Sequence, residues 1–366
     1  MDNPTLHFIV TYAGLIGLIS MSLCLLIYGY SRRQTDRGGR EGDLDAKQAA
    51  HTRPTPRIAG IAIFASIFFG IVFAPSYAVW PYLKFMLAAS IVFGVGLLED
   101  LGRHVSPFWR LMAAVASSLA VVLLFGEWIP HADVPGLDGL MGYWYVGVPL
   151  TLLVTAGVAN GFNLIDGVNG FAAFAGVVAA ISLSLISYQT DYHLVFHLGW
   201  MLAAAILGFA VINYPFGLIF LGDAGAYTLG FVISWLGIAV LNHNPLVSPW
   251  AILLVVFWPV ADMLLALWRR RRRKVAAMHP DRLHMHQLIM RGLEICWLGP
   301  ERRLMANSLT TVILAPFMIA PAATGILFWD HSRIAVLFIL LYGVLFFGFY
   351  QFVFRFVVRH RRKTVA

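Results

Sequence analysis

The chain has 366 residues, of which 60% are hydrophobic, 14% are aromatic and only 12% are charged. This composition excludes an ordinary soluble domain and is typical of a protein that crosses a membrane many times. The formal net charge of +8 does not indicate nucleic-acid binding, because the basic residues gather in short segments between apolar ones. We therefore expect an all-α polytopic integral membrane bundle that binds no nucleic acid.

Runs of about 20 apolar residues predict eleven transmembrane helices. They cover residues 7–29, 58–78, 81–98, 108–125, 147–165, 170–188, 195–213, 225–241, 249–268, 308–328 and 334–357. We expect one transmembrane domain over residues 1–366, with residues 269–305 as a cytoplasmic substrate-binding loop. The two cysteines, Cys24 and Cys296, lie in an apolar run and in a basic loop, so no disulfide is expected.

The distribution of basic residues predicts the orientation. With alternating loops, 24 of the 26 Lys and Arg residues fall on one side, and only Lys84 and Arg333 fall on the other. The positive-inside rule then places the N-terminus outside and the C-terminus in the cytoplasm. Six carboxylates, at or just beyond helix ends, share the predicted cytoplasmic side; they are Glu99, Asp100, Asp166, Asp223, Asp262 and Asp281. This placement predicts one shared site at that face.

The stretch Asn160–Gly170 interrupts two long apolar runs with three amides, one carboxylate and three glycines. If the incoming segment stays helical, Asn160, Asn163 and Asp166 recur every three residues and share one face. A polar face at the mouth of a membrane helix is costly unless its groups find partners. For the whole cluster we favour a ligand site, although a single Asn is as readily explained by interhelical hydrogen bonds.

Two further segments on that side carry charges suited to phosphate chemistry. Before residue 58, prolines hold the chain extended, and His51, Arg53 and Arg57 would present cationic or hydrogen-bonding groups to phosphate oxygens. Ordinary positive-inside charge is the alternative interpretation for Arg57. The adjacent acids Glu99 and Asp100 suit a general base, a Mg²⁺ ligand or both, and a solvated helix end is their alternative.

The segment from Asn213 to Ala226 contains a second acid beside glycines, Asp223. A helix beginning near Ala224 would point free backbone N–H groups at the predicted site, where they would attract phosphate. A carboxylate beside a phosphate site most naturally holds a divalent metal, whereas a plain N-cap is the alternative role for Asp223.

The last polar elements are an acid near the end of the ninth span and a histidine-containing loop. For Asp262, structural pairing with one of the arginines in Arg269–Arg273 and a functional role are weighted equally. In the loop, four residues suit hydrogen bonding to a pyrophosphate or a nucleoside: Asp281, Arg282, His284 and His286.

Five blocks in this order resemble the polyprenyl-phosphate N-acetylhexosamine-1-phosphate transferases, a group within glycosyl transferase family 4. The blocks are His51–Gly60, Glu99-Asp100, Asn160–Gly170, Phe220–Gly225, and the segment from Pro259 and Asp262 to Gln287. The resemblance implies transfer of a sugar 1-phosphate, most readily GlcNAc 1-phosphate, from a UDP-N-acetylhexosamine to undecaprenyl phosphate with release of UMP. It implies Mg²⁺ or Mn²⁺ as cofactor and the bacterial inner membrane as location, with a second copy of the chain as a candidate partner.

Carried over to this sequence, the resemblance makes Glu99, Asp100 and Asp166 catalytic, with Asp166 and Asp223 as metal ligands. It places His284 and His286 at the nucleotide-sugar site, and Asn160, Asn163 and Asn213 near the substrates. Three positions depart from the family pattern. Glu99 stands where the family usually has Asp, Asn169 where a second Asp is often found, and Gln287 where a further His is often found. We expect Asn169→Asp to preserve or raise turnover, since the site is expected to have room for the acid.

Two alternatives of another class remain. A transporter or lipid flippase would place its substrate groups near the bilayer midplane, often within inverted repeats. The acids lie instead at one face, and no repeat is visible. A catalytically decayed membrane scaffold would fit the changes at Asn169 and Gln287, but the retained Glu99, Asp100, Asp166 and Asp223 argue against it.

Overall fold

The structure is a computed structural model that describes residues 9–35, 55–274, 281 and 283–365. This part of the chain is helical and contains no strand, which confirms the all-α prediction. Its main helices are α2 (Gly14–Thr35), α3 (Gly60–Phe69), α4 (Ser76–Asp100), α5 (Pro107–Phe125), α6 (Asp138–Met141), α7 (Trp144–Ile165), α8 (Phe171–Gln189), α9 (His193–Asn213), α10 (Gly222–His243), α11 (Pro249–Val255), α12 (Phe257–Arg272), α13 (Met285–Leu293), α14 (Arg303–Leu327) and α15 (Ser332–Val365).

Nine helices of the described residues are long and apolar enough to cross a membrane, and the pair α11 and α12 adds a tenth if it counts as one span. The chain is therefore a multi-pass membrane protein. Each of the eleven predicted spans corresponds to helical structure, but the count of eleven stays a prediction. The predicted span 58–78 contains the short helix α3, the 3₁₀ turn Gly70–Phe73 and the first three residues of α4. The predicted span 249–268 bends by 84° between α11 and α12.

One predicted boundary is wrong. The sequence placed a break between residues 78 and 81, whereas α4 begins at Ser76 and continues through Pro81. The chain turns earlier, at Pro75, whose extended backbone (ψ 149°) ends the preceding segment. Prolines also begin other helices, since Pro107 and Pro249 occupy first-turn positions where a backbone N–H is not needed.

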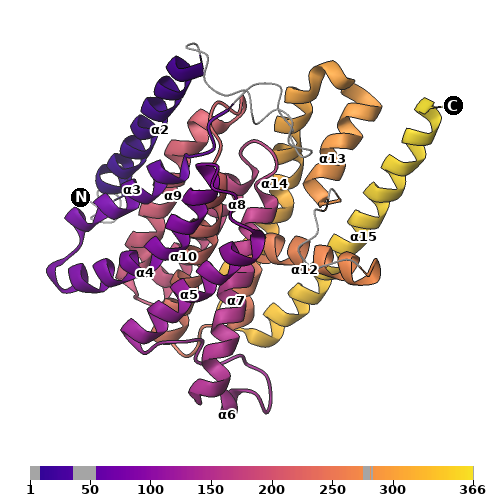
Figure 1. The fold of residues 1–366 in the computed structure, drawn as a ribbon. Helices are drawn as coiled ribbons and strands as arrows, with labels where there is room; N and C mark the ends of the chain where they lie inside the picture. The colour runs from indigo at the N-terminus through magenta and orange to yellow at the C-terminus, as the bar shows by residue number, and fades with distance from the viewer. Residues whose placement is uncertain (1–8, 36–54, 275–280, 282, 366) are drawn as a thin grey trace.

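Helix α10 is the core of the bundle, and 89% of the residues in its apolar 18-residue stretch are buried. Small residues let its neighbours approach closely, as is common between membrane helices. A Cβ atom on Gly96 of α4 would lie 2.6 Å from the Ala224 backbone, and one on Gly230 would lie 2.5 Å from Ala159 of α7. In Figure 1, α2 and α15 lie at opposite edges of the bundle around this core.

The two ends of the bundle differ in their connections. The short helix α6 lies at one end, and α13 lies at the other (Figure 1). Helices α4 and α7 finish, and α5 and α10 begin, at a common end that we call the site end. The polar segments highlighted by the sequence therefore meet around the first turn of α10.

Candidate active site

The carboxylate of Asp100, the last residue of α4, covers the first turn of α10. Its two oxygens accept hydrogen bonds from the backbone N–H groups of Asp223 and Ala224, each at 2.8 Å. Gly222 makes this approach feasible, because its φ is +75° and a Cβ atom there would collide with Asp100 and with the Arg57 backbone oxygen. The expectation that these N–H groups point freely towards a phosphate is therefore wrong. The Asp100 side chain already satisfies them.

The polar face of α7 lies against the same turn of α10. The Tyr227 hydroxyl donates to Asn160 at 3.2 Å, and the Asn163 amide donates to Asp223 at 2.7 Å. The Gly222 backbone N–H donates to Asp166. Asn160 and Asn163 of α7, and Asp166 directly after its last residue, all contact α10, so the predicted polar side chains do meet on one side. Tyr227 was not among the residues singled out by the sequence.

Asp223 is buried and forms an ion pair with Arg110, near the start of α5. Its carboxylate contacts Asn163 and Arg110 from two different helices, and the N-cap residue of α10 is Leu221, which makes no side-chain cap. The interpretation of Asp223 as a plain N-cap is therefore wrong. Sequence reasoning missed Arg110, because an Arg at the start of the predicted span 108–125 was counted only as positive-inside charge.

The site carries an excess of negative charge. The charges of Arg57, Asp166 and Glu99 all act on the Asp100 carboxyl group. With Asp223, four carboxylates face two guanidinium groups, those of Arg57 and Arg110, in the described part of the site. Burial raises the pKa of Asp166 to about 6, although the Arg57 charge and the Gly222 N–H oppose this shift. An added cation would relieve that repulsion.

Two asparagines, Asn213 and Asn169, form hydrogen bonds between the α7–α8 loop and the α9–α10 loop. Asn213 accepts the Gly170 N–H at 2.6 Å and donates to the Ile219 oxygen at 2.7 Å, so its polar atoms join the α7–α8 loop to the α9–α10 loop. Asn169 is 1% exposed and donates to the Pro215 oxygen at 2.8 Å. An Asp at this position would have nearly the same size but would lose this amide donor and place a charge in a buried environment, so the expectation for Asn169→Asp stays a prediction.

A second, enclosed carboxylate, Asp262 of α12, binds the histidine loop. Asp262 is fully buried, its Oδ2 lies 2.7 Å from His284 Nδ1, and its Oδ1 accepts the Met285 N–H at 3.3 Å. The interpretation of Asp262 as a partner of the arginine run is wrong, because Arg269 donates instead to Asp281, at 3.0 Å from its Nε. Burial opposes ionisation of Asp281, but Arg269 outweighs it and holds the pKa of Asp281 below its usual range.

His286 connects this loop to the α7–α8 loop. Its ring is buried, lies 5.6 Å from the Phe171 ring between centroids, and occupies the space that a Cβ atom on Gly167 would need. Neither ring nitrogen has a hydrogen-bond partner among the residues that the structure describes. Burial lowers the pKa of His286 to about 3, so the ring is neutral near pH 7. A neutral imidazole can accept or donate one hydrogen bond to a ligand.

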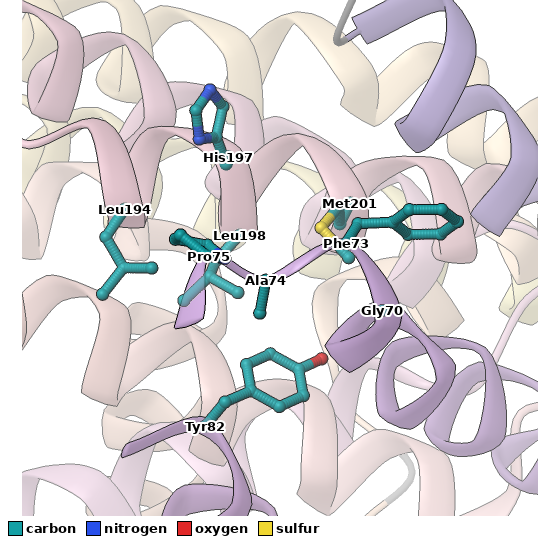
Figure 2. A pocket seen from close by; sticks show the side chains of 9 residues that line it. All are labelled: Gly70, Phe73, Ala74, Pro75, Tyr82, Leu194, His197, Leu198 and Met201. Atoms are coloured by element: carbon teal, nitrogen blue, oxygen red, sulfur yellow. The ribbon is translucent and has the colours of Figure 1, made fainter. Parts of the chain in front are cut away.

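The remaining predicted residues are placed differently. Arg57 has an exposed side chain and a backbone oxygen next to Gly222. His51, Arg53 and Arg282 lie outside the described residues. A small apolar cavity of about 30 Å³ lies elsewhere, against the first turns of α9, and holds none of the predicted site residues. Figure 2 shows it between Leu194, Pro75 and Tyr82, and it has room for no more than one or two water molecules.

Residues 82–241 match the model of glycosyl transferase family 4. Over these residues the chain is similar to glycosyl transferase family 4. The matched region contains the acids of α4, the polar face of α7 and the start of α10, whereas the histidine loop lies beyond it. The chain is 26% identical over 294 residues to a probable undecaprenyl-phosphate N-acetylglucosaminyl 1-phosphate transferase of Bacillus subtilis, with 79% of each chain covered.

Two further relatives carry the name undecaprenyl-phosphate alpha-N-acetylglucosaminyl 1-phosphate transferase. The one from Yersinia pestis is 26% identical over 326 residues, with 86% of each chain covered. The one from Escherichia coli K12 is 26% identical over 294 residues, covering 75% of this chain and 76% of the relative. The family match, these relatives and the membrane helices together support a membrane glycosyltransferase.

Proposed function

We propose that this protein transfers an N-acetylhexosamine 1-phosphate, in the first instance GlcNAc 1-phosphate, from a UDP-sugar to undecaprenyl phosphate. An oxygen of the lipid phosphate attacks the phosphorus bonded to the sugar, the bond from that phosphorus to UMP breaks, and the lipid pyrophosphoryl sugar forms. Such a reaction would begin a bacterial surface polysaccharide such as O-antigen. The observation that carries the proposal is the meeting of Asp100, Asp166 and Asp223 around the first turn of α10.

A divalent metal, Mg²⁺ or Mn²⁺, fits the residues present. The described residues contain no group of three or more His, Cys, Asp or Glu side chains arranged to hold a metal ion. Mg²⁺ does not require one, because it is usually bound through one or two carboxylates together with substrate phosphates and water. Asp223 would hold it, with the Asn163 amide beside it and Asp166 nearby. When bound, the metal neutralises negative charge on the pyrophosphate.

The two acids at the end of α4 have separate tasks in this proposal. Both oxygens of Asp100 accept backbone N–H groups, so Asp100 holds the first turn of α10 in place. Glu99 has a buried oxygen, Oε2, with no hydrogen-bond partner in the described part of the chain. Glu99 is therefore the better placed of the two to take a proton from the lipid phosphate, whose second pKa lies near 6 by analogy with other phosphate monoesters.

The neutral His286 completes the site on the donor side. Its unpartnered ring nitrogens and its contact with Gly167 place it beside the loop that carries Asp166. Asp262 orients the loop, because its carboxylate binds both the His284 ring and the Met285 backbone N–H. We propose that His286 binds the nucleotide sugar and that Asp262 acts only by positioning the loop.

The test is a transfer assay with purified protein in lipid nanodiscs. Undecaprenyl phosphate and a panel of UDP-N-acetylhexosamines are supplied, and UMP and the lipid product are measured with and without added Mg²⁺. We expect UMP release with at least one donor and only with added metal. A preparation that binds UDP-sugar but yields no lipid product with any donor would contradict the proposed reaction.

We also propose that the site faces the cytoplasm of a bacterial inner membrane. Two exposed positions can be replaced by cysteine to test this orientation. Ser106 lies at the site end, and Gly139 lies in α6 at the other end. In intact cells an impermeant thiol reagent should label only the Gly139 replacement. Labelling of the Ser106 replacement from outside would reverse the proposed orientation.

A further inference from the structure

In the ion pair between Arg110 and Asp223, the guanidinium group of Arg110 occupies the carboxylate that the proposed metal would bind. Asp223 Oδ1 accepts the Asn163 amide at 2.7 Å, and Oδ2 faces Arg110. Both oxygens thus already have donors. Since Asn163 turns its NH₂ group towards Asp223, its carbonyl oxygen faces away. A metal ion that binds Asp223 Oδ2 must therefore displace Arg110, and it gains Asn163 as a further ligand only if the amide turns over to present its oxygen.

The buried position of Asp223 explains why the protein keeps a cation there. A carboxylate removed from water is costly unless a counter-ion or several donors compensate it. Asp223 is 6% exposed, and Arg110 supplies the compensating charge from the neighbouring helix α5. Arg110 is itself only partly satisfied, because its buried Nε has no partner among the described residues. Its guanidinium group therefore has a donor to offer to another anion.

We propose that Arg110 is a counter-cation that competes with the divalent metal for Asp223. When the nucleotide binds, Arg110 leaves Asp223 and binds the phosphates of the nucleotide. Arg110 moves to the pyrophosphate, whose oxygens suit a guanidinium group, while the metal replaces it on Asp223. Metal and nucleotide then bind cooperatively, and a metal ion alone binds weakly. This inference rests on the proposed metal-dependent function, and it assigns Arg110 a role in the order of binding.

The expected size of the effect follows from linkage between two sites. Couplings of this kind commonly change affinity by about 5–150-fold, and they are reciprocal. UDP should therefore tighten Mn²⁺ binding to the wild-type protein by a factor in that range, and Mn²⁺ should tighten UDP binding equally. Removing the Arg110 charge should tighten Mn²⁺ binding to the nucleotide-free protein and shrink the effect of UDP, because the competitor is gone.

The experiment measures Mn²⁺ binding by electron paramagnetic resonance of the free ion, with protein in nanodiscs, with and without UDP. The variants are Arg110→Gln, Arg110→Lys and Asp223→Asn, and Arg333→Gln at the other end of the bundle is the matched control. We expect Arg110→Gln to bind Mn²⁺ at least about 5-fold more tightly than wild type without UDP. Arg110→Lys keeps a cation and should bind Mn²⁺ as weakly as wild type does.

Each outcome separates the inference from the function on which it rests. If wild type binds Mn²⁺ at Asp223 with UDP, but Arg110→Gln gains no affinity without UDP, the counter-cation inference is overturned and the metal site stands. If Asp223→Asn binds Mn²⁺ as wild type does, the metal is not at Asp223 and the counter-cation inference fails with that placement of the metal, while the transfer assay alone decides the proposed reaction. Should Arg110→Gln not fold, Arg110→Lys still decides, because tightened binding in that variant would contradict competition by charge.

Discussion

Asp223 and Asp262 are two buried carboxylates that the sequence placed on the same face of the membrane, yet their surroundings differ. Asp223 pairs with Arg110, a partly exposed side chain, and lies among other acids. Asp262 is fully enclosed with His284 and the Met285 backbone. The first carboxylate has a partner that can exchange for a ligand, and the second has partners that hold a loop. Burial alone therefore does not separate a binding carboxylate from a structural one, but the identity of its partners does.

The largest expected effect is on activity at Asp223. Asp223→Asn should lower turnover by more than about 100-fold, the upper range for residues that only support a metal ligand, even at saturating Mg²⁺. Turnover and thermal unfolding of the purified variant are the measurements. The matched control is Asp191→Asn, an exposed loop acid whose left-handed φ of 55° Asn tolerates well. An active Asp223→Asn enzyme would remove the contrast with Asp262.

At Asp262 the main effect should be on stability. Asp262→Ala leaves His284 and the Met285 N–H without their buried partner, and breaking such a pair costs about 3–5 kcal/mol. Asp330→Ala provides the control, because Asp330 pairs with His331 at 2.6 Å on the exposed surface. Surface pairs contribute about 0–1 kcal/mol. Thermal unfolding in nanodiscs should therefore shift clearly for Asp262→Ala and little for Asp330→Ala.

Asn169 tests whether the site tolerates another acid. Asn169→Asp loses the amide that donates to the Pro215 oxygen and should cost about 1–3 kcal/mol, with reduced turnover. Asn244→Asp is the control, because Asn244 uses its oxygen to accept the Leu246 N–H, which an Asp can also do. An Asn169→Asp protein with unchanged stability and raised turnover would restore the expectation from the sequence.

The smallest effect concerns the pH dependence of stability. The pKa of His286 is lowered to about 3 by burial, whereas an unfolded histidine takes up a proton near pH 6.5. The unfolded state thus binds more protons below pH 6.5, so acidification destabilises the folded protein by up to about 1.4 kcal/mol per pH unit. His286→Gln should flatten the loss of unfolding temperature between pH 7 and 5. The exposed His104→Gln should leave the wild-type slope unchanged.

The sequence by itself determined the membrane class, the approximate spans and the polar face of α7. These features depend on local composition and helical periodicity, which a chain carries in its own residues. It also indicated the acids that meet at the site end, because they end or begin apolar runs. Cavities, boundaries such as Pro75 and the bend between α11 and α12 were not determined, since short breaks in an apolar run have no distinct local pattern.

Only the tertiary structure decided which partner each acid has. Asp100 holds a helix that begins more than 120 residues later, Asp223 takes an arginine from α5, and Asp262 takes a histidine from a loop. These contacts depend on how closely α4, α7 and α10 pack, which the small residues at their crossings allow. A local segment can require that a buried charge be compensated. It cannot specify the distant residue that compensates it, because helix packing sets that distance.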